Sequence, residues 1–204
     1  MRADSIAFAV SGMLFGVIVG WILASQQHAS VPLAAPATAA AAPAANGSGR
    51  PPAAPLDEAR ARELTAAASN APNDPSPRVQ LGNLYFDAER YPEAVEWYEQ
   101  ALRLNPNDAN VSTDLGVAYY YTDQADKAIA QFEQSLKVDP KHTKTMLNMG
   151  IVKAFGKQDL AGASAAWEQV IATAPNSPEA EAAKKALDGL KAAHPGGPAA
   201  GTGS

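Results

Sequence analysis

The chain of 204 residues contains no cysteine. It therefore forms no disulfide, carries no lipid on an N-terminal cysteine, and has no thiol to serve as nucleophile or metal ligand. Three histidines are present, His28, His142 and His194, and none has a second ligand residue at the spacing of a metal site. Glycine-rich phosphate loops and the serine motif of a nucleophile elbow are also missing. We therefore predict no catalytic residues, no metal and no cofactor, and we expect a protein that is not an enzyme.

Positive charge is scarce as well. The formal net charge is −5 at pH 7. Residues 56–194 hold every acidic residue except Asp4 and every basic residue except Arg2 and Arg50, so this segment alone carries −6. A surface that binds nucleic acid needs lysine and arginine to neutralise phosphates. The charge therefore argues against a nucleic-acid partner and agrees with an acidic, soluble surface.

The sequence does contain a pattern that recurs after 34 residues, beginning with Leu81-Gly82 and again with Leu115-Gly116. The further matched positions are Tyr85 and Tyr119, Ala94 and Ala128, Tyr98 and Phe132, Ala101 and Ser135, and Pro106 and Pro140. This period and these residue types resemble the tetratricopeptide repeat (TPR) family, whose pattern is L-G-x2-Y…A-x3-F…P. The resemblance implies an all-α solenoid of helical hairpins that serves as a binding surface.

A third repeat follows with altered spacing. Met149-Gly150 keeps the 34-residue phase, whereas Ala163, Trp167 and Pro175 fall one position late. We interpret this shift as one extra residue in the turn between the two helices of the repeat, within 156–160. Lys153 also stands where the family has a bulky aromatic residue.

The predicted TPR domain spans residues 56–194. Capping segments are expected at both ends, because a stack of repeats otherwise leaves apolar end faces in water. Ser177 is the predicted N-cap of the closing helix. The predicted elements are a capping helix at 56–70, about three repeats at 75–108, 109–142 and 143–177, and a closing helix at 178–193.

Residues 1–25 are predicted to form a transmembrane signal anchor. The segment from Ile6 to Ala24 has 19 residues and no charge, and a helix of that length spans ~28 Å, close to the hydrocarbon thickness of a bilayer. Cleavage as a signal peptide is the alternative. Arg2 precedes the segment and no basic residue follows before Arg50, so the positive-inside rule places the repeats outside the cytoplasm. In a bacterium, this means a single-pass protein of the inner membrane whose repeats face the periplasm.

Three glycines, Gly12, Gly16 and Gly20, share one face of the predicted membrane helix. Such a face allows close approach of another membrane helix or of a second copy, although glycine is also common in membrane helices generally. Residues 26–55 are dominated by alanine and proline and are predicted to be a flexible tether. The glycine-rich segment 195–204 is predicted to be a disordered tail.

The TPR resemblance further implies that the first helix of each repeat lines a concave peptide-binding groove. Tyr120 and Tyr121 are expected to anchor a ligand there, and the alternative is that they pack against the neighbouring repeat. Val79 and Asp114 stand where chaperone-binding TPR domains need lysine and asparagine, so we expect a hydrophobic or amphipathic peptide and not an acidic C-terminus. The implied groove residues are Val79, Asn83, Phe86, Asp87, Asn110, Thr113, Val117, Tyr120, Tyr121, Lys144, Leu147, Ile151 and Phe155.

The whole layout resembles bacterial membrane-anchored TPR proteins. It implies a membrane-tethered interaction module that captures a peptide or protein segment as an adaptor or assembly scaffold. The stretch 148–163 with Trp167 is similar to TPR proteins of cytochrome c biogenesis, so one alternative is a maturation factor that holds an apocytochrome segment. Another alternative is a structural subunit of a membrane complex assembled through the glycine-rich span.

Overall fold

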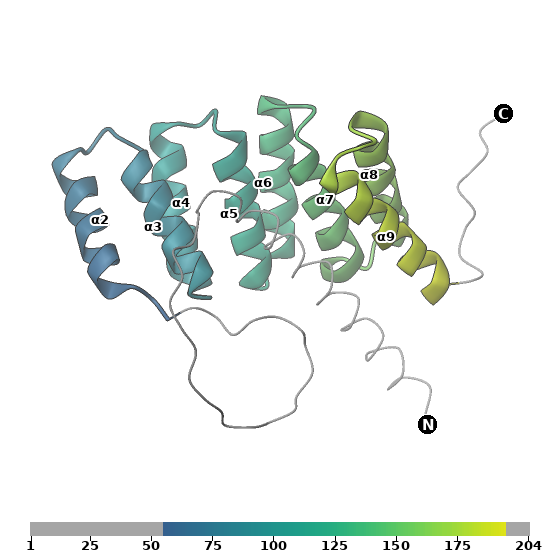
Figure 1. The fold of residues 1–204 in the computed structure, drawn as a ribbon, viewed down its shortest axis with the longest axis horizontal. Helices are drawn as coiled ribbons and strands as arrows, with labels where there is room; N and C mark the ends of the chain where they lie inside the picture. Colours follow the sequence, from purple (N-terminus) through teal and green to yellow (C-terminus); the bar gives the residue numbers. More distant parts are fainter. Residues whose placement is uncertain (1–54, 195–204) are drawn as a thin grey trace, which may run out of the picture. The chain divides into compact units, whose positions relative to one another are not determined.

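The computed structural model describes residues 55–194, which form eight α-helices and one π-helical turn stacked in a row (Figure 1). No strand occurs within this range. The prediction of an all-α fold is therefore confirmed for the described residues. The elements are α2 (Glu58–Asn70), α3 (Ser76–Asp87), α4 (Tyr91–Leu104), α5 (Ala109–Tyr121), α6 (Ala125–Val138), α7 (Thr143–Ile151), η1 (Val152–Gly156), α8 (Leu160–Thr173) and α9 (Pro178–Ala193).

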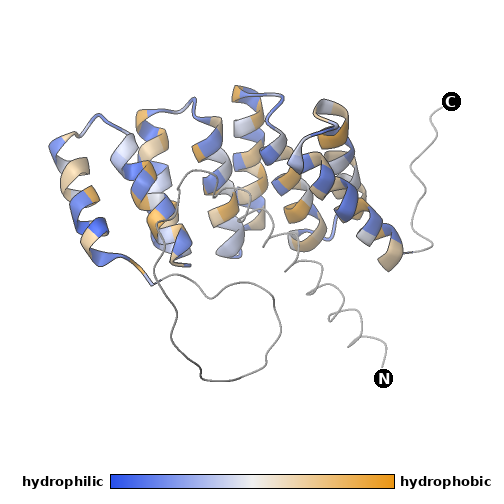
Figure 2. Ribbon diagram, in the orientation of Figure 1, coloured by the Kyte–Doolittle hydropathy of each residue, from blue (hydrophilic) through white to orange (hydrophobic). Residues whose placement is uncertain are grey.

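Three helical hairpins make up the body of the stack: α3 packs on α4, α5 on α6, and α7 on α8 (Figure 1). Each hairpin reverses through a residue with positive φ, namely Glu89 at 57°, Asp123 at 60° and Gln158 at 56°. Polar and apolar segments alternate along the helices (Figure 2), as expected of helices that each bury one face.

Each hairpin closes where an aromatic ring of the second helix lies against a glycine of the first. A Cβ atom added to any of these glycines would lie 2.4 Å or less from the ring, which is closer than a real contact permits. The three rings are fully buried. Glycine is therefore required here for the close approach of two helices. The pairs are Gly82 with Tyr98, Gly116 with Phe132, and Gly150 with Trp167.

The extra residue of the third repeat lies at the end of the first helix and not in the turn. In η1 the Lys157 N–H donates to the Val152 carbonyl at 3.1 Å, a hydrogen bond across five residues that takes up one more residue than an α-helical turn. The turn that follows, 157–159, has three residues, as in the first two hairpins. The prediction of an extra residue in the turn around 156–160 is wrong, because the spacing of the recurring residue types gives the added length but not the hydrogen-bond ring that contains it.

This π-helical turn also changes which residues are equivalent between repeats. Gln158 and Asp123 hold the same positive-φ position in their turns. Counted back from that position, Phe155 is equivalent to Tyr120, and Gly156 is equivalent to Tyr121. A strict 34-residue phase would instead pair Phe155 with Tyr121.

Capping helices close the stack at both ends. The α2 helix packs on α3, and α9 packs on both α8 and α7. The Asp57 carboxylate accepts the Arg60 N–H at 2.9 Å, and the Ser177 hydroxyl accepts the Ala180 N–H at 3.1 Å. These bonds satisfy amide donors that the first turn of a helix otherwise leaves open.

No helix within residues 55–194 has both the length and the apolar character needed to cross a bilayer. The predicted anchor at 1–25 with Gly12, Gly16 and Gly20, the tether up to residue 54 and the tail at 195–204 lie outside the described residues.

Candidate functional site

The helices α3, α5 and α7 present equivalent positions to one side of the stack, and several predicted groove residues there remain accessible to solvent. We call these residues, with Asp114 of α5, the first-helix face. Three are exposed and four are half-buried. The exposed members are Asn83, Asp87 and Asn110, and the half-buried members are Val79, Asp114, Val117 and Lys144.

Four other predicted groove residues are buried in the structure. Phe86 is 9% exposed, Thr113 0%, Leu147 1% and Ile151 3%. Every residue from Thr145 to Ile151 of α7 is buried, since α7 packs against α8 and also against α9. These four residues are buried in this conformation, and we correct that part of the prediction.

Tyr121 belongs to an aromatic cluster at the end of α5. Its ring stacks on Tyr91 with a centroid distance of 4.4 Å and an interplanar angle of 10°. The Phe86 ring meets Tyr121 and Tyr91 edge-on at 5.8 Å and 5.2 Å. This geometry is favourable for aromatic pairs, and it joins the first hairpin to the second.

Tyr120 points toward the third repeat. It packs against the core cluster that contains Phe132 and Met149, and a Cβ atom at Gly156 would lie 3.1 Å from its ring. Phe155, the equivalent residue of the third repeat, is half-buried. Tyr120 and Tyr121 are therefore held by packing between repeats, which is the alternative role that the sequence left open.

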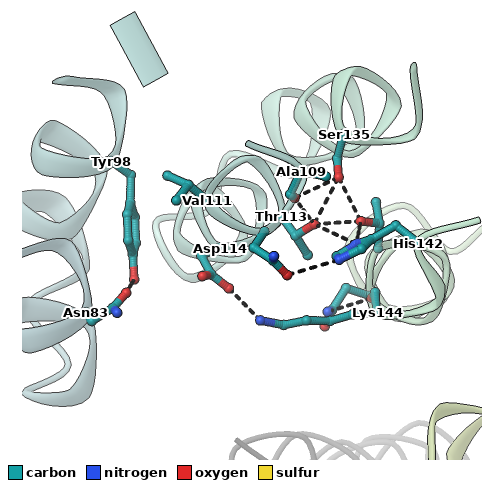
Figure 3. Close-up of polar contacts among 12 residues, drawn as sticks. Asn83, Tyr98, Ala109, Val111, Thr113, Asp114, Ser135, His142 and Lys144 are labelled. Atoms are coloured by element: carbon teal, nitrogen blue, oxygen red, sulfur yellow. Dashed lines mark hydrogen bonds and ion pairs between the residues drawn. The ribbon is translucent and has the colours of Figure 1, made fainter. Parts of the chain in front are cut away.

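The polar side chains of the first-helix face bond to one another across helices (Figure 3). The Tyr98 hydroxyl of α4 donates to the Asn83 side-chain oxygen at 2.8 Å. The Lys144 ammonium of α7 donates to the Asp114 carboxylate at 2.8 Å, with the two side chains 24% and 23% exposed. The ion pair thus links the second repeat to the third and neutralises the cation of this face.

Asp87 differs from Asp114, because within residues 55–194 its carboxylate has no ion pair and accepts no hydrogen bond. Desolvation of the carboxylate raises the pKa of Asp87, and the negative charge of Asp114 raises it further. Burial likewise raises the pKa of the Tyr98 phenol, with added contributions from Asp114 and Asp87.

A second polar group lies at the junction of the second and third repeats (Figure 3). The hydroxyls of Ser135 and Thr145 are 2.8 Å apart, and the Thr145 hydroxyl lies 2.6 Å from Nδ1 of His142. Nε2 of His142 lies 3.0 Å from the Asn110 side-chain oxygen. The Ser135 hydroxyl also donates to the Ala109 carbonyl at 2.9 Å.

This cluster holds the repeats together and has no accessible nucleophile, since Ser135, Thr145 and the adjoining Thr113 are each 0% exposed. Desolvation lowers the pKa of His142, so the neutral ring is favoured. Sequence reasoning missed the cluster. The available indication was Ser135, a hydroxyl residue where the first repeat has Ala101.

Metal binding has no support from the described part of the chain. Residues 55–194 contain no group of three or more histidine, aspartate or glutamate side chains arranged to hold an ion.

Comparison with family models gives two matches. Residues 82–123 match a model described as TPR repeat, and residues 109–142 match one described as Tetratricopeptide repeat. The sequence has no match among curated proteins.

Several solved structures share the fold. The crystal structure of MamA has a TM-score of 0.55 at 19% identity, covering 65% of this chain and 84% of that one. The NMR structure of the first TPR domain of human RPAP3 has a TM-score of 0.53 at 22% identity, covering 61% and 98%. The first TPR of Spaghetti (RPAP3) bound to the HSP90 peptide SRMEEVD has a TM-score of 0.50 at 22% identity, covering 67% and 95%.

At these identities the structural likeness establishes the fold alone. The family models, however, match the segment in which the 34-residue pattern is most regular. The same segment forms the glycine-closed hairpins seen in the structure. From the repeats and the fold together, the chain belongs to the tetratricopeptide repeat family.

Proposed function

We propose that this protein is an interaction module that holds a peptide or protein segment on its first-helix face. The observation that carries the proposal is the accessibility of a mixed surface on α3 and α5, where Val79 and Val117 lie among Asn83 and Asn110. Solenoids of this kind use the extended surface of stacked repeats for binding. A surface that combines apolar and amide side chains suits an amphipathic segment.

The RPAP3 domain gives support by analogy, since that protein was solved with the HSP90 peptide SRMEEVD bound. Two features of the present chain differ from what an acidic peptide requires. Lys144 is already paired with Asp114 at 2.8 Å, and Asp87 adds a further negative charge nearby. We therefore propose a hydrophobic or amphipathic partner.

Site-specific crosslinking in the source cell tests the location of the partner. The photoreactive residue p-benzoylphenylalanine would replace exposed Asn83 on α3 in the full chain, and exposed Leu104 on α4 would serve as the control position. We expect a crosslinked product from position 83 and none from position 104. A product from position 104 alone would place the partner on the second helices and contradict the proposal.

A matched pair of substitutions measures the contribution of the face. Val79→Glu places a charge on the first-helix face, and Val138→Glu makes the same change at a residue of α6 that is 39% exposed. We expect Val79→Glu to weaken binding of the crosslinked partner by about tenfold or more, roughly the 1.4 kcal/mol of one lost apolar contact. Equal effects of the two changes would contradict a site on the first-helix face.

Membrane tethering is a further part of the proposal and rests on the uncharged segment from Ile6 to Ala24. In that arrangement the repeats of a bacterial inner-membrane protein would face the periplasm, at the end of the 26–55 tether. Carbonate extraction and protease accessibility of the repeats in spheroplasts test this. Release of the full chain by carbonate would contradict a membrane span.

Two narrower roles follow from the resemblance alone. The identity of the crosslinked partner and substitutions in the full chain distinguish them. A partner with a haem-attachment motif of the C-x-x-C-H type would favour the role in cytochrome c maturation. Loss of function on replacing Gly12, Gly16 and Gly20 with leucine, with an intact first-helix face, would favour a structural subunit assembled through its span.

A further inference from the structure

The first-helix face has one more carboxylate than it has cations. Its charged members are Asp87, Asp114 and Lys144. Lys144 forms an ion pair with Asp114 at 2.8 Å, whereas no cation pairs with Asp87 within residues 55–194. The unpaired carboxylate is therefore the most distinctive charge on this surface.

Asp87 is also placed beside groups that a ligand would approach. It lies one helical turn beyond Asn83 on α3, and residues four apart share a helix face. The Asn83 side-chain oxygen accepts a hydrogen bond from the Tyr98 hydroxyl at 2.8 Å. This bond fixes the position of the Asn83 side chain. Val79 precedes Asn83 by the same interval. The order along α3 is thus apolar, amide, carboxylate.

The surroundings make the bare carboxylate unfavourable. Desolvation and the neighbouring Asp114 both raise the pKa of Asp87. A partner that covers this face would remove more water from both carboxylates and increase that cost unless it supplied a positive charge. A partner with a negative charge at this point would add repulsion to both carboxylates.

We propose that the segment captured on the first-helix face carries a lysine or arginine whose side chain pairs with Asp87, together with an apolar residue that packs on Val79, two helical turns away on α3. This inference rests on the proposed function of peptide capture. It names the chemistry of the captured segment, which carries one basic and one apolar residue at separate positions. A ligand of this chemistry differs from SRMEEVD, the acidic peptide bound in the RPAP3 complex.

The test uses the full chain, held in detergent micelles, and four fluorescein-labelled libraries of twelve-residue peptides. The libraries share one apolar composition and differ only in an invariant central residue, which is lysine, arginine, glutamine or glutamate. Anisotropy titrations measure binding at 50 mM and 500 mM salt. We expect the lysine and arginine libraries to bind about tenfold more tightly than the glutamine library at low salt, and the difference to shrink at high salt.

Two variants assign this preference to one carboxylate. Asp87→Asn should remove the preference for lysine and arginine over glutamine. Glu133→Gln, which removes a charge from an exposed residue of α6, should leave the preference as it is in the parent chain. Circular dichroism confirms that both variants are folded.

The outcomes separate the charge preference from peptide capture itself. Equal binding of the lysine and glutamine libraries would overturn the charge preference and leave peptide capture standing. A preference for lysine and arginine that survives in Asp87→Asn would also overturn the inference, because the group that pairs with the basic residue would then not be Asp87. Binding of none of the four libraries would overturn the proposed function together with this inference.

Discussion

The indole of Trp167 occupies the space in which a side chain of Gly150 would begin. A Cβ atom at Gly150 would lie 2.2 Å from Nε1 of Trp167, and that same nitrogen donates its hydrogen to the Leu147 carbonyl at 3.2 Å. The contact joins α7 to α8 at the centre of the third hairpin. It also explains why tryptophan can replace the smaller rings of Tyr98 and Phe132 there, since its polar atom finds a backbone acceptor.

Gly150→Ala should therefore destabilise the protein. A methyl group has no room against a buried indole, and overpacking of this kind costs roughly 1–3 kcal/mol. Alanine in place of glycine within a free helix has the opposite effect, a gain of about 1 kcal/mol. Urea unfolding of the full chain distinguishes the two, and a gain in stability would contradict the close contact.

Deleting Lys153 should be tolerated, because η1 contains one residue more than the C-terminal turns of α3 and α5, which hold the equivalent place in the first two repeats. The deletion removes the hydrogen-bond ring across five residues and restores the 34-residue spacing of the first two repeats. We expect the free energy of unfolding to change by less than about 1 kcal/mol. Deleting Ala118, which is buried in α5, is the matched control and should cost roughly 3 kcal/mol or more. Equal loss in both would mean that η1 is needed for packing.

Asp114→Asn should change the charge that this face accepts. The substitution frees the Lys144 ammonium, which the parent chain holds at 2.8 Å from the carboxylate. We expect binding of the acidic peptide SRMEEVD to improve by about threefold or more, measured by anisotropy, since a charge-assisted hydrogen bond becomes available. Asp126→Asn breaks a second Asp–Lys pair of the described residues, with Lys157 at 2.6 Å, and should leave peptide binding unchanged. No gain in Asp114→Asn would show that Lys144 cannot reach the ligand.

Stability should fall as the pH is lowered through the normal range of histidine. Burial lowers the pKa of folded His142 below 6.5, and Lys144 acts in the same direction, whereas Asp139, Asp114 and Glu179 oppose it. Below pH 6.5 the unfolded chain binds a proton that the folded ring does not, so folding becomes less favourable as the pH falls.

His142→Asn should remove this contribution and give a flatter profile between pH 7 and pH 5. The variant should also lose about 1 kcal/mol at pH 7, because the ring's bonds to Thr145 and Asn110 are incompletely replaced. Urea midpoints at several pH values give both quantities. An unchanged slope would contradict a neutral, desolvated His142.

The regular features of the fold follow from residue types at fixed intervals. The repeat of Leu-Gly, tyrosine and proline after 34 residues predicts the helical hairpins, because glycine permits close packing and proline ends a helix. The two family matches lie in this regular segment. Where the period slipped by one residue, the sequence predicted an insertion but misplaced it, since an extra residue fits a turn or a helix equally well in terms of chain length.

The candidate site was predicted less completely, for a physical reason. Register along a helix indicates which residues share a face, but whether that face meets water depends on what packs upon it. The closing helix α9 covers α7, so Leu147 and Ile151 are buried although Val79 and Val117 are not fully covered. Likewise, the sequence predicted Tyr121 as a ligand anchor, whereas in the structure its ring stacks on Tyr91.

The sequence by itself determined the repeat, the hairpins and the shortage of positive charge, because these depend on spacing and composition along one chain. Only the tertiary structure decided that Lys144 pairs with Asp114 while Asp87 has no ion pair within residues 55–194, and that the hydroxyls of Ser135 and Thr145 meet His142. Those partners are brought together by packing between α3, α5, α6 and α7. A pairing between residues on different helices depends on distances of a few ångströms, which the order of residues along the chain does not specify.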